Sequence, residues 1–274
     1  MRAKRKMTKL TTAEKRIVVA IVLKKCVLKR VDISTEQISI KLIGICYNSN
    51  MNKIIPHVLN ADSYLDDFLP AIEKAIARAK QIAYKELDIT WPIDLVITSG
   101  IPEINGAEGV GGRTCNESVI IINIDTICNP SSTLIYQIIC HELCHAAKEG
   151  FNPNDDCEIL FDDLIHEGFA IYYEKHLSTK QKSVRDSVKI ITNVSETQAH
   201  KLLKKMPPLS QHWGEYDASS ILGDGIKAGY GHWAGYKIGY FLVCQYLQKT
   251  RTSFISALHD GNIKYRQKLS EYIK

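Results

Sequence analysis

The sequence predicts an α+β fold. Two six-residue stretches, 93–98 and 119–124, are rich in branched apolar residues, as expected of short buried strands. Several longer segments after residue 61 instead repeat apolar residues at the three- and four-residue spacing of amphipathic helices. The chain has 274 residues, of which 45% are hydrophobic and 24% charged, a composition that can bury a globular core. The sequence therefore predicts one α+β domain with room for a small extension.

The N-terminal part of the chain differs in charge from the rest. Residues 1–30 contain eleven Lys or Arg and one acidic residue, whereas the remainder contains 24 basic and 29 acidic residues. Such an end can contact nucleic acid or an anionic membrane, but charged ends are more often solvated, so we expect no nucleic-acid partner. We interpret residues 1–60 as a basic extension of unknown role and residues 61–274 as the main domain.

Within this extension, the sequence favours no single secondary structure. Thr11 to Glu14 fits a capping box, which predicts a helix that runs toward Arg30. The apolar run 17–23 contains enough β-branched residues to form a strand instead. Both alternatives stay open.

No segment of the sequence has the length of a membrane span. The longest early apolar run, 17–23, ends at two lysines and lacks the small residues of a signal-peptide cleavage site. The eight cysteines are scattered without the spacing of a disulfide framework, which indicates reduced thiols. We therefore expect a cytoplasmic protein, and nothing in the sequence indicates its oligomeric state.

The elements of the main domain follow from periodicity and from turn signals. A helix is expected to begin at Asp62 or Ser63 and to end near Leu87, before the first strand. The Gly-rich stretch 106–112 lacks the Gly-Lys-Ser/Thr ending of a phosphate loop, so we interpret it as a turn before the second strand. The segment Asn-Pro-Ser-Ser at 129–132 marks the start of the next helix.

The segment 140–145 contains an HExxH motif. Four residues turn an α-helix by roughly 400°, so His141 and His145 lie about 40° apart on one face, where two imidazoles can bind one Zn²⁺. Glu142 lies roughly 100° around the helix, beside the metal. At that position it can accept a proton from water whose pKa the metal lowers.

A catalytic zinc needs a third protein ligand and an open fourth position. Glu167 follows His145 by twenty-two residues, in a segment that also reads as a helix. The apolar stripe of that helix is made by Leu160, Leu164 and Ile171. Glu167 belongs to this inward stripe, where a metal is the best partner for a carboxylate, and Gly168 would allow a neighbouring helix to approach closely. His166 is the competing ligand, although it lies about 100° away on the polar side.

These motifs resemble those of gluzincins, HExxH metallopeptidases whose third zinc ligand is a helical Glu. The aminopeptidases among them have Asn-Glu-Gly-Phe-Ala, which is similar to His-Glu-Gly-Phe-Ala at 166–170. Together with the segment 233–240, the pattern resembles a bacterial family of predicted zinc-dependent proteases that is still named for its unknown function. The resemblance covers about residues 61–250. It implies a zincin-like fold, in which a small sheet lies over the active-site helix and a mostly helical second half follows.

The sequence departs from the family pattern at two positions. His166 replaces the small residue that precedes the ligand Glu, and Ile171 stands where many gluzincins have an Asp that orients a zinc-bound His. The orienting role would then belong to Asp162 or Asp163. The resemblance favours Asp162, although the helical wheel allows Asp163 equally.

A third helical block, from about residue 232 to 247, contains the candidates for an oxyanion donor. Tyr236 is the first choice, with His232 and Tyr240 as alternatives. Tyr and Gly at helical spacing also occur where helices simply pack closely.

Cys140 and Cys144 flank the histidines of the motif. They are rotated away from the two imidazoles, so all four side chains cannot bind one metal. We expect buried free thiols, because free Cys behaves as a small hydrophobic residue.

The sequence thus leads to two hypotheses. The first is a zinc peptidase in which His141, His145 and Glu167 bind Zn²⁺ and Glu142 is the base, with strand 119–124 as the upper edge of the cleft, where it pairs with an extended peptide or protein substrate. The alternative is a zinc-stabilised binding or regulatory protein whose basic N-terminus contacts nucleic acid or membrane. The two differ in whether a fourth protein ligand closes the metal site.

Overall fold

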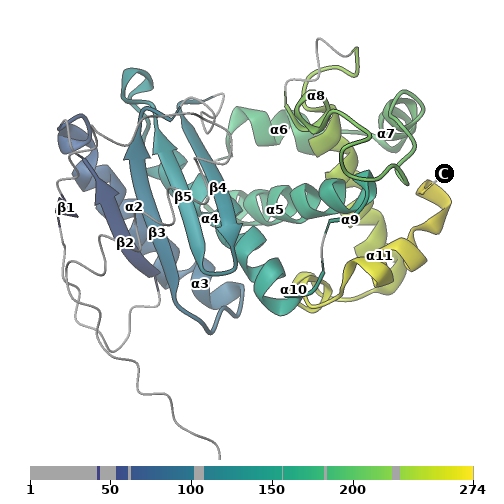
Figure 1. Cartoon of the computed structure of the whole chain (residues 1–274), viewed down its shortest axis with the longest axis horizontal. Coiled ribbons are helices and arrows are strands. Elements are labelled where there is room, and N and C mark those ends of the chain that lie inside the picture. The colour runs from purple at the N-terminus through teal and green to yellow at the C-terminus, as the bar shows by residue number, and fades with distance from the viewer. Residues whose placement is uncertain are drawn as a thin grey trace, which may run out of the picture. The chain divides into compact units, whose positions relative to one another are not determined.

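The computed structural model describes residues 42–43, 54–60, 63–101, 108–155, 157–181, 184–223 and 229–273 (Figure 1). The helix or strand expected between residues 11 and 30 lies outside the described residues. Among the helices of the described part, none is long and apolar enough to cross a membrane.

Five strands form one sheet on one side of the described domain (Figure 1). They are β1 (Leu42–Ile43), β2 (Ile54–Leu59), β3 (Ile93–Ser99), β4 (Val110–Asn116) and β5 (Val119–Ile124). Their order in the sheet is β1-β2-β3-β5-β4. The central strands β2, β3 and β5 are parallel, and the outer strands β1 and β4 are each antiparallel to their neighbour.

Strands β3 and β5 confirm the two predicted strands. The expectation that 119–124 forms an edge is wrong, however, because β5 lies between β3 and β4 and all six of its residues are buried. The prediction of a turn for the whole Gly-rich stretch is also wrong in its last part. Gly111 and Gly112 belong to β4, which is the edge strand. An uninterrupted apolar run such as that of β5 is typical of an interior strand. The glycines of β4 are uncommon in strands, so the sequence did not indicate this edge strand.

Strand β2 lies on the N-terminal side of the boundary expected near residue 60. Ile54 and Val58 are almost fully buried in the core, and β2 pairs with β3 over five residues from Ile54↔Ile93 to Val58↔Ile97. The sheet therefore includes residues upstream of 61.

The helical segment expected between about residue 62 and Leu87 is present but interrupted. It consists of the 3₁₀ turn η1 (Asp66–Phe68), α2 (Leu69–Gln81) and α3 (Ala83–Glu86). The buried face of α2 is formed by Ile72, Ala75, Ile76 and Ala79, at the spacing that the sequence shows. This helical connection carries the chain from β2 to its parallel neighbour β3, as parallel pairing requires.

Helix α4 (Ser132–Phe151) follows the short η3 turn (Thr126–Cys128) and carries the HExxH motif. The Ser131 hydroxyl caps it by accepting from the Leu134 N–H, and Pro130 directly precedes this cap, which confirms the predicted start. Thirteen of its twenty residues are buried, because α4 packs against the sheet on one side and against the helices on another. Buried Cys140 and Cys144 belong to this packing, and burial raises the pKa of both thiols.

The second half of the domain is helical (Figure 1). Its helices are α5 (Leu160–Gln181), α6 (Asp186–Thr192), α7 (Glu196–Leu203), α8 (Ala218–Leu222), α9 (Ala234–Thr250), α10 (Phe254–Leu258) and α11 (Asn262–Lys268), followed by the turn η4 (Ser270–Tyr272). Helices α5 and α9 touch through Gly168 and Gly239: a Cβ on Gly239 would lie 2.1 Å from the carbonyl oxygen of Leu164. This close approach brings the start of α9 toward the face of α5 that carries Glu167.

Candidate metal centre

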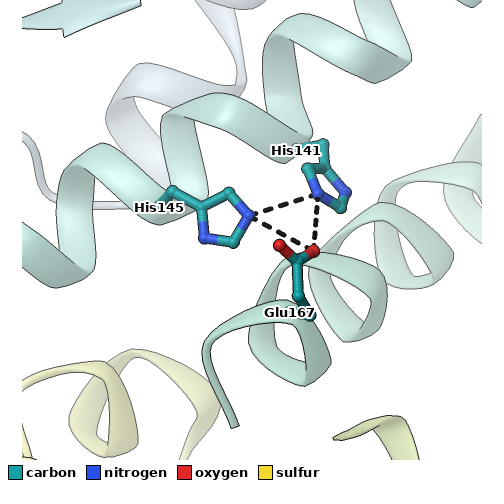
Figure 2. A group of neighbouring side chains, drawn as sticks. All are labelled: His141, His145 and Glu167. Atoms are coloured by element: carbon teal, nitrogen blue, oxygen red, sulfur yellow. Dashed lines mark hydrogen bonds and ion pairs between the residues drawn. The ribbon is translucent and has the colours of Figure 1, made fainter. Parts of the chain in front are cut away.

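Two neighbouring helices bring three possible metal ligands together (Figure 2). Helix α4 supplies His141 and His145, one turn apart, and α5 supplies Glu167. The two Nε2 atoms lie 3.2 Å apart. Oε2 of Glu167 lies 3.4 Å from Nε2 of His141 and 3.6 Å from Nε2 of His145. Three neutral or anionic donor atoms therefore face one point.

The spacing of these donors fits zinc. A tetrahedral ion with ligands at ~2.0–2.1 Å separates any two ligand atoms by about 3.3 Å, close to the three distances between His141, His145 and Glu167. Oε2 of Glu167 is also buried without a hydrogen-bond partner, which is costly for a carboxylate oxygen unless a cation satisfies it. Among the described residues, His141, His145 and Glu167 are the group of His, Cys, Asp and Glu side chains that could hold a metal ion.

The charges around His141 also favour binding of a cation at this site. Burial lowers the pKa of this imidazole, but the carboxylates of Glu167 and Glu174 outweigh it and raise the pKa to about 10. Burial opposes ionisation of Glu167, yet the nearby imidazoles of His145 and His141 hold its pKa below the ordinary value. Without a metal, a proton on His141 supplies positive charge to this cluster.

His166 does not join the three ligand atoms. Its ring stacks on that of His145 with 5.9 Å between centroids, and burial lowers its pKa well below the ordinary value, so it stays neutral. The side chain lines the cleft beside the donors. The helical-wheel argument, which favoured Glu167 over His166, agrees with this arrangement.

Glu142 lies in the same cleft, a cavity of about 260 Å³ whose walls include β4 residues Gly112 and Thr114. The Thr114 hydroxyl lies 2.9 Å from both Oε2 and the backbone oxygen of Glu142, and its single hydrogen can be donated to either. Gly112 provides the space for this carboxylate, because a Cβ there would lie 2.5 Å from Cγ and Oε1 of Glu142. The edge strand thus holds Glu142 in the cleft next to the three candidate ligands, but not as one of them.

Tyr236, near the start of α9, also lines the cleft. The negative charge of Glu167, followed by burial, raises the pKa of Tyr236 well above its ordinary value, so its hydroxyl remains a donor. The two alternatives lie elsewhere. His232 is exposed and its ring packs on Trp233, whereas Tyr240 accepts a hydrogen bond from Lys175. Of the three candidates, Tyr236 is the one among the described residues that lines the cleft.

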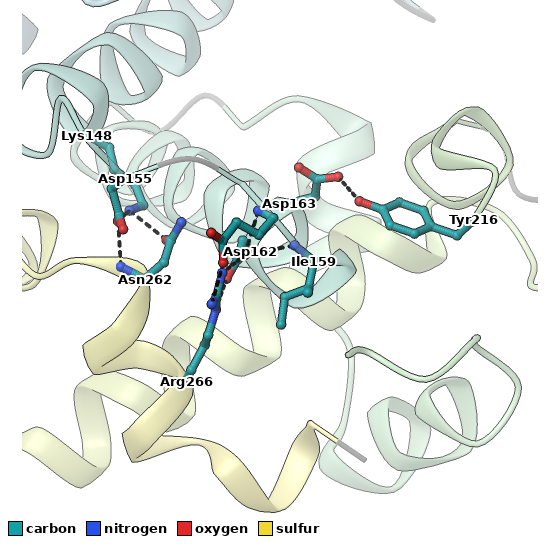
Figure 3. A network of polar contacts seen from close by, with 9 residues as sticks. Lys148, Asp155, Ile159, Asp162, Asp163, Tyr216, Asn262 and Arg266 are labelled. Atoms are coloured by element: carbon teal, nitrogen blue, oxygen red, sulfur yellow. Dashed lines mark hydrogen bonds and ion pairs between the residues drawn. The ribbon is translucent and has the colours of Figure 1, made fainter. Parts of the chain in front are cut away.

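The expectation that Asp162 or Asp163 orients a ligand histidine is wrong (Figure 3). Asp162 is fully buried, but its carboxylate accepts from Nε and Nη2 of Arg266 at 2.9 and 2.5 Å and from the N–H groups of Glu158 and Ile159. It therefore ties α11 to the start of α5. Asp163 accepts from the hydroxyl of Tyr216.

The carboxylate behind His141 belongs to Glu174 instead. Its Oε2 lies 3.4 Å from Nδ1 of His141, on the side of the ring opposite the ligand atom. Arg185, just before α6, donates to both oxygens of Glu174, with 2.7 Å between Nη2 and Oε2. Burial opposes ionisation of Glu174, but the Arg185 charge holds its pKa below the ordinary value.

The match to known families agrees with this site. A family model described as "Predicted Zn-dependent protease (DUF2268)" matches residues 70–261. The chain belongs to this family. The matched region of the predicted zinc-dependent protease family includes all three ligand candidates, Glu142 and Tyr236. Comparison with curated proteins gives no significant match.

Three features of the site were missed from sequence. Glu174 follows Glu167 by seven residues, which is two helical turns, so it lies on the same face and its position in the apolar stripe was a usable signal. Gly112 and Thr114 gave no such signal, because they act through a strand pairing that the Gly-rich composition concealed.

Proposed function

We propose that this chain is a zinc-dependent peptidase that hydrolyses peptide bonds with a Glu base. The observation that carries the proposal is the convergence of His141, His145 and Glu167 on one point, with Oε2 of Glu167 buried and unpaired. Glu142 and Tyr236 line the same cleft. Membership of a family described as predicted zinc-dependent proteases supports this reading.

We assign the fold to the zincin-like type. Three features support the assignment: an HExxH helix packed against the sheet, an antiparallel edge strand beside that helix, and a second helix that carries the third ligand. In this assignment α4 is the active-site helix, β4 forms the upper rim of the cleft, and α5 supplies Glu167.

The chain's own residues have distinct roles in the proposed reaction. Zinc bound by the three ligands would supply Lewis-acid chemistry and lower the pKa of a water molecule to about 7. Glu142 accepts the proton of the attacking water and later donates it to the leaving amine. The Thr114 hydroxyl holds the Glu142 carboxylate in place. The Tyr236 hydroxyl donates to the substrate carbonyl oxygen as negative charge develops there.

The substrate would be an extended peptide segment that pairs with the outer edge of β4. This strand pairs with β5 on one side, and its residues Gly112, Arg113 and Thr114 line the cleft. Extended peptides bind such edges through main-chain hydrogen bonds. The edge role proposed from sequence for 119–124 thus moves to β4.

A zinc-stabilised binding protein is the alternative function. A structural zinc site is closed by four protein ligands, whereas a catalytic site keeps one position open. The metal-binding group among the described residues has three members, and Glu142 lies in the open cleft beside them, which favours the peptidase.

The experiment that tests the proposal compares Glu142→Gln with the wild type on a peptide library. The zinc-loaded wild type should cleave peptides, and the variant should keep its zinc and lose about 10²–10⁴-fold in rate, because an amide cannot act as the base. Glu73→Gln, at an exposed position of α2, is the matched control. Absence of cleavage by the zinc-loaded wild type would favour the binding protein, and loss of zinc in Glu142→Gln would contradict the assigned role.

A further inference from the structure

We propose that Glu174 and Arg185 together position His141 for metal binding, by fixing which ring nitrogen carries the proton. The inference rests on the proposed function only in that His141 is taken as a zinc ligand. Neither residue belongs to the motif, and both lie C-terminal to Glu167.

The geometry behind His141 leads to this assignment. Its Nε2 faces the other two donors, whereas its Nδ1 is buried without a hydrogen-bond partner and lies 3.4 Å from Oε2 of Glu174, within ion-pair distance. A buried ring N–H needs an acceptor, and Glu174 is the acceptor that the described residues offer Nδ1. A separation of 3.4 Å is long for a hydrogen bond, and such contacts tighten when a site is occupied.

Arg185 restricts the Glu174 carboxylate to accepting hydrogen bonds. The Glu174 side chain is fully buried, and the largely buried Arg185 donates to both of its oxygens through Nε and Nη2. The carboxylate can therefore only accept, so in the neutral imidazole that binds a metal the proton must be on Nδ1. The lone pair is then on Nε2, the atom that faces Glu167 and His145.

The same guanidinium connects Glu174 to two further elements. Nη1 of Arg185 lies 3.7 Å from Glu108, whose carboxylate accepts from the Ser187 N–H at the start of α6. Glu108 precedes β4 closely. Arg185 thus connects Glu174 of α5 to the start of α6 and to the segment before β4. The Glu174 carboxylate cannot turn away from His141 without breaking these contacts.

A second buried carboxylate on α5 provides a matched control. Asp162 is as buried as Glu174 and is also paired with an arginine, Arg266, but these two residues anchor α11 (Figure 3). Disrupting either pair should lower stability. Only disruption at Glu174 should change the affinity of the chain for zinc.

The test is zinc affinity of the folded full-length chain, measured by competition with a chromogenic chelator. Glu174→Gln keeps the side-chain shape but has a single oxygen, which cannot serve Arg185 and His141 fully at the same time. We expect zinc to bind about 10–100-fold more weakly, the usual cost of losing such a partner. Asp162→Asn should lower the melting temperature of the metal-free chain and leave zinc affinity within about twofold of the wild type.

A double variant separates positioning from a structural role. In Glu174→Gln/Arg185→Met, the amide oxygen is released from the guanidinium and can turn to Nδ1 of His141. We expect zinc affinity to recover to within about threefold of the wild type, although a purely structural role predicts a further loss. If the double variant fails to fold, ¹⁵N spectra of histidine-labelled, zinc-loaded wild type and Glu174→Gln separate the two roles. Positioning predicts that the Nδ1–H signal of His141 shifts in the variant, whereas a purely structural role predicts that it does not.

Each result has a distinct meaning. Unchanged zinc affinity in Glu174→Gln, an equal loss in Asp162→Asn, or a His141 proton on Nε2 would overturn the inference and leave the proposed function standing. Tight zinc binding without peptide cleavage would contradict the proposed function and leave the inference intact. A wild type that binds no zinc would overturn both.

Discussion

The edge strand controls the position of the proposed base, so a single methyl group at Gly112 should abolish the proposed peptidase activity without preventing zinc binding. In Gly112→Ala, the new Cβ would lie 2.5 Å from Cγ and Oε1 of Glu142, whereas ordinary contacts begin near 3.4 Å. The Glu142 carboxylate must therefore move by roughly 1 Å, because it is the end of a flexible side chain and β4 is fixed by its pairing with β5. A misplacement of about 1 Å at a reacting group can cost ~10²-fold in rate.

The assay is kcat on one cleaved peptide together with zinc content. Gly112→Ala should retain one zinc per chain and lose about 10²-fold in kcat. Gly261→Ala is the matched control, since the nearest atom to its Cβ would be 3.5 Å away, an ordinary contact, and neither Gly261 nor its neighbour Asp155 lines the cleft. Wild-type kcat in Gly112→Ala would refute the assigned position of Glu142. Loss of zinc in that variant would refute the distinction between base and ligand.

Three further variants test the third ligand, the contact between α5 and α9, and the role of the N-terminal residues. Glu167→Ala should weaken zinc binding more than His166→Ala does in chelator competition, because Glu167 supplies a donor atom and His166 only stacks on His145; the reverse order would make His166 the third ligand. Gly239→Ala should destabilise the fold by about 1–3 kcal/mol in chemical unfolding, because its Cβ would lie 2.1 Å from a carbonyl of α5; wild-type stability would contradict the close helix contact. Deletion of residues 1–30 should leave zinc content, melting temperature and peptide cleavage largely unchanged, since these residues contain no His and a single carboxylate; an insoluble or zinc-free truncation would place them in the catalytic core.

The sequence carried most of the information about the candidate metal ligands. The spacing of His141 and His145 fixes a common helix face, and the apolar stripe around Glu167 indicates its inward direction. Both arguments depend only on the period of a helix, which tertiary structure does not alter. The structure accordingly brings these three side chains together.

The partner of His141 was predicted incorrectly because the family position after Glu167 is Ile171, which left Asp162 and Asp163 as the carboxylates considered. Glu174 satisfies the same helical-face criterion on the C-terminal side. Its counterion, Arg185, comes from the start of another helix, and periodicity carries no information about which arginine reaches a buried carboxylate. Asp162, which the resemblance favoured, pairs with Arg266 for the same unpredictable reason.

The order of the strands in the sheet was the second feature that was predicted incorrectly from the sequence. The six buried residues of β5 formed an apolar run, which indicates a strand covered on both faces and was a usable argument against an edge position. Strand β4 resisted prediction because Gly111, Gly112 and Asn116 have low strand propensity. Close packing against Glu142 requires glycine at 112, so the demands of the site overrode local preference.

The most direct test of the account is the zinc content of the purified full-length chain. Elemental analysis after zinc loading and exhaustive dialysis should give one zinc per chain, and replacement of His141, His145 or Glu167 by Ala should lower that value. A sub-stoichiometric result for the wild type after loading would contradict the metal centre on which the proposed function depends.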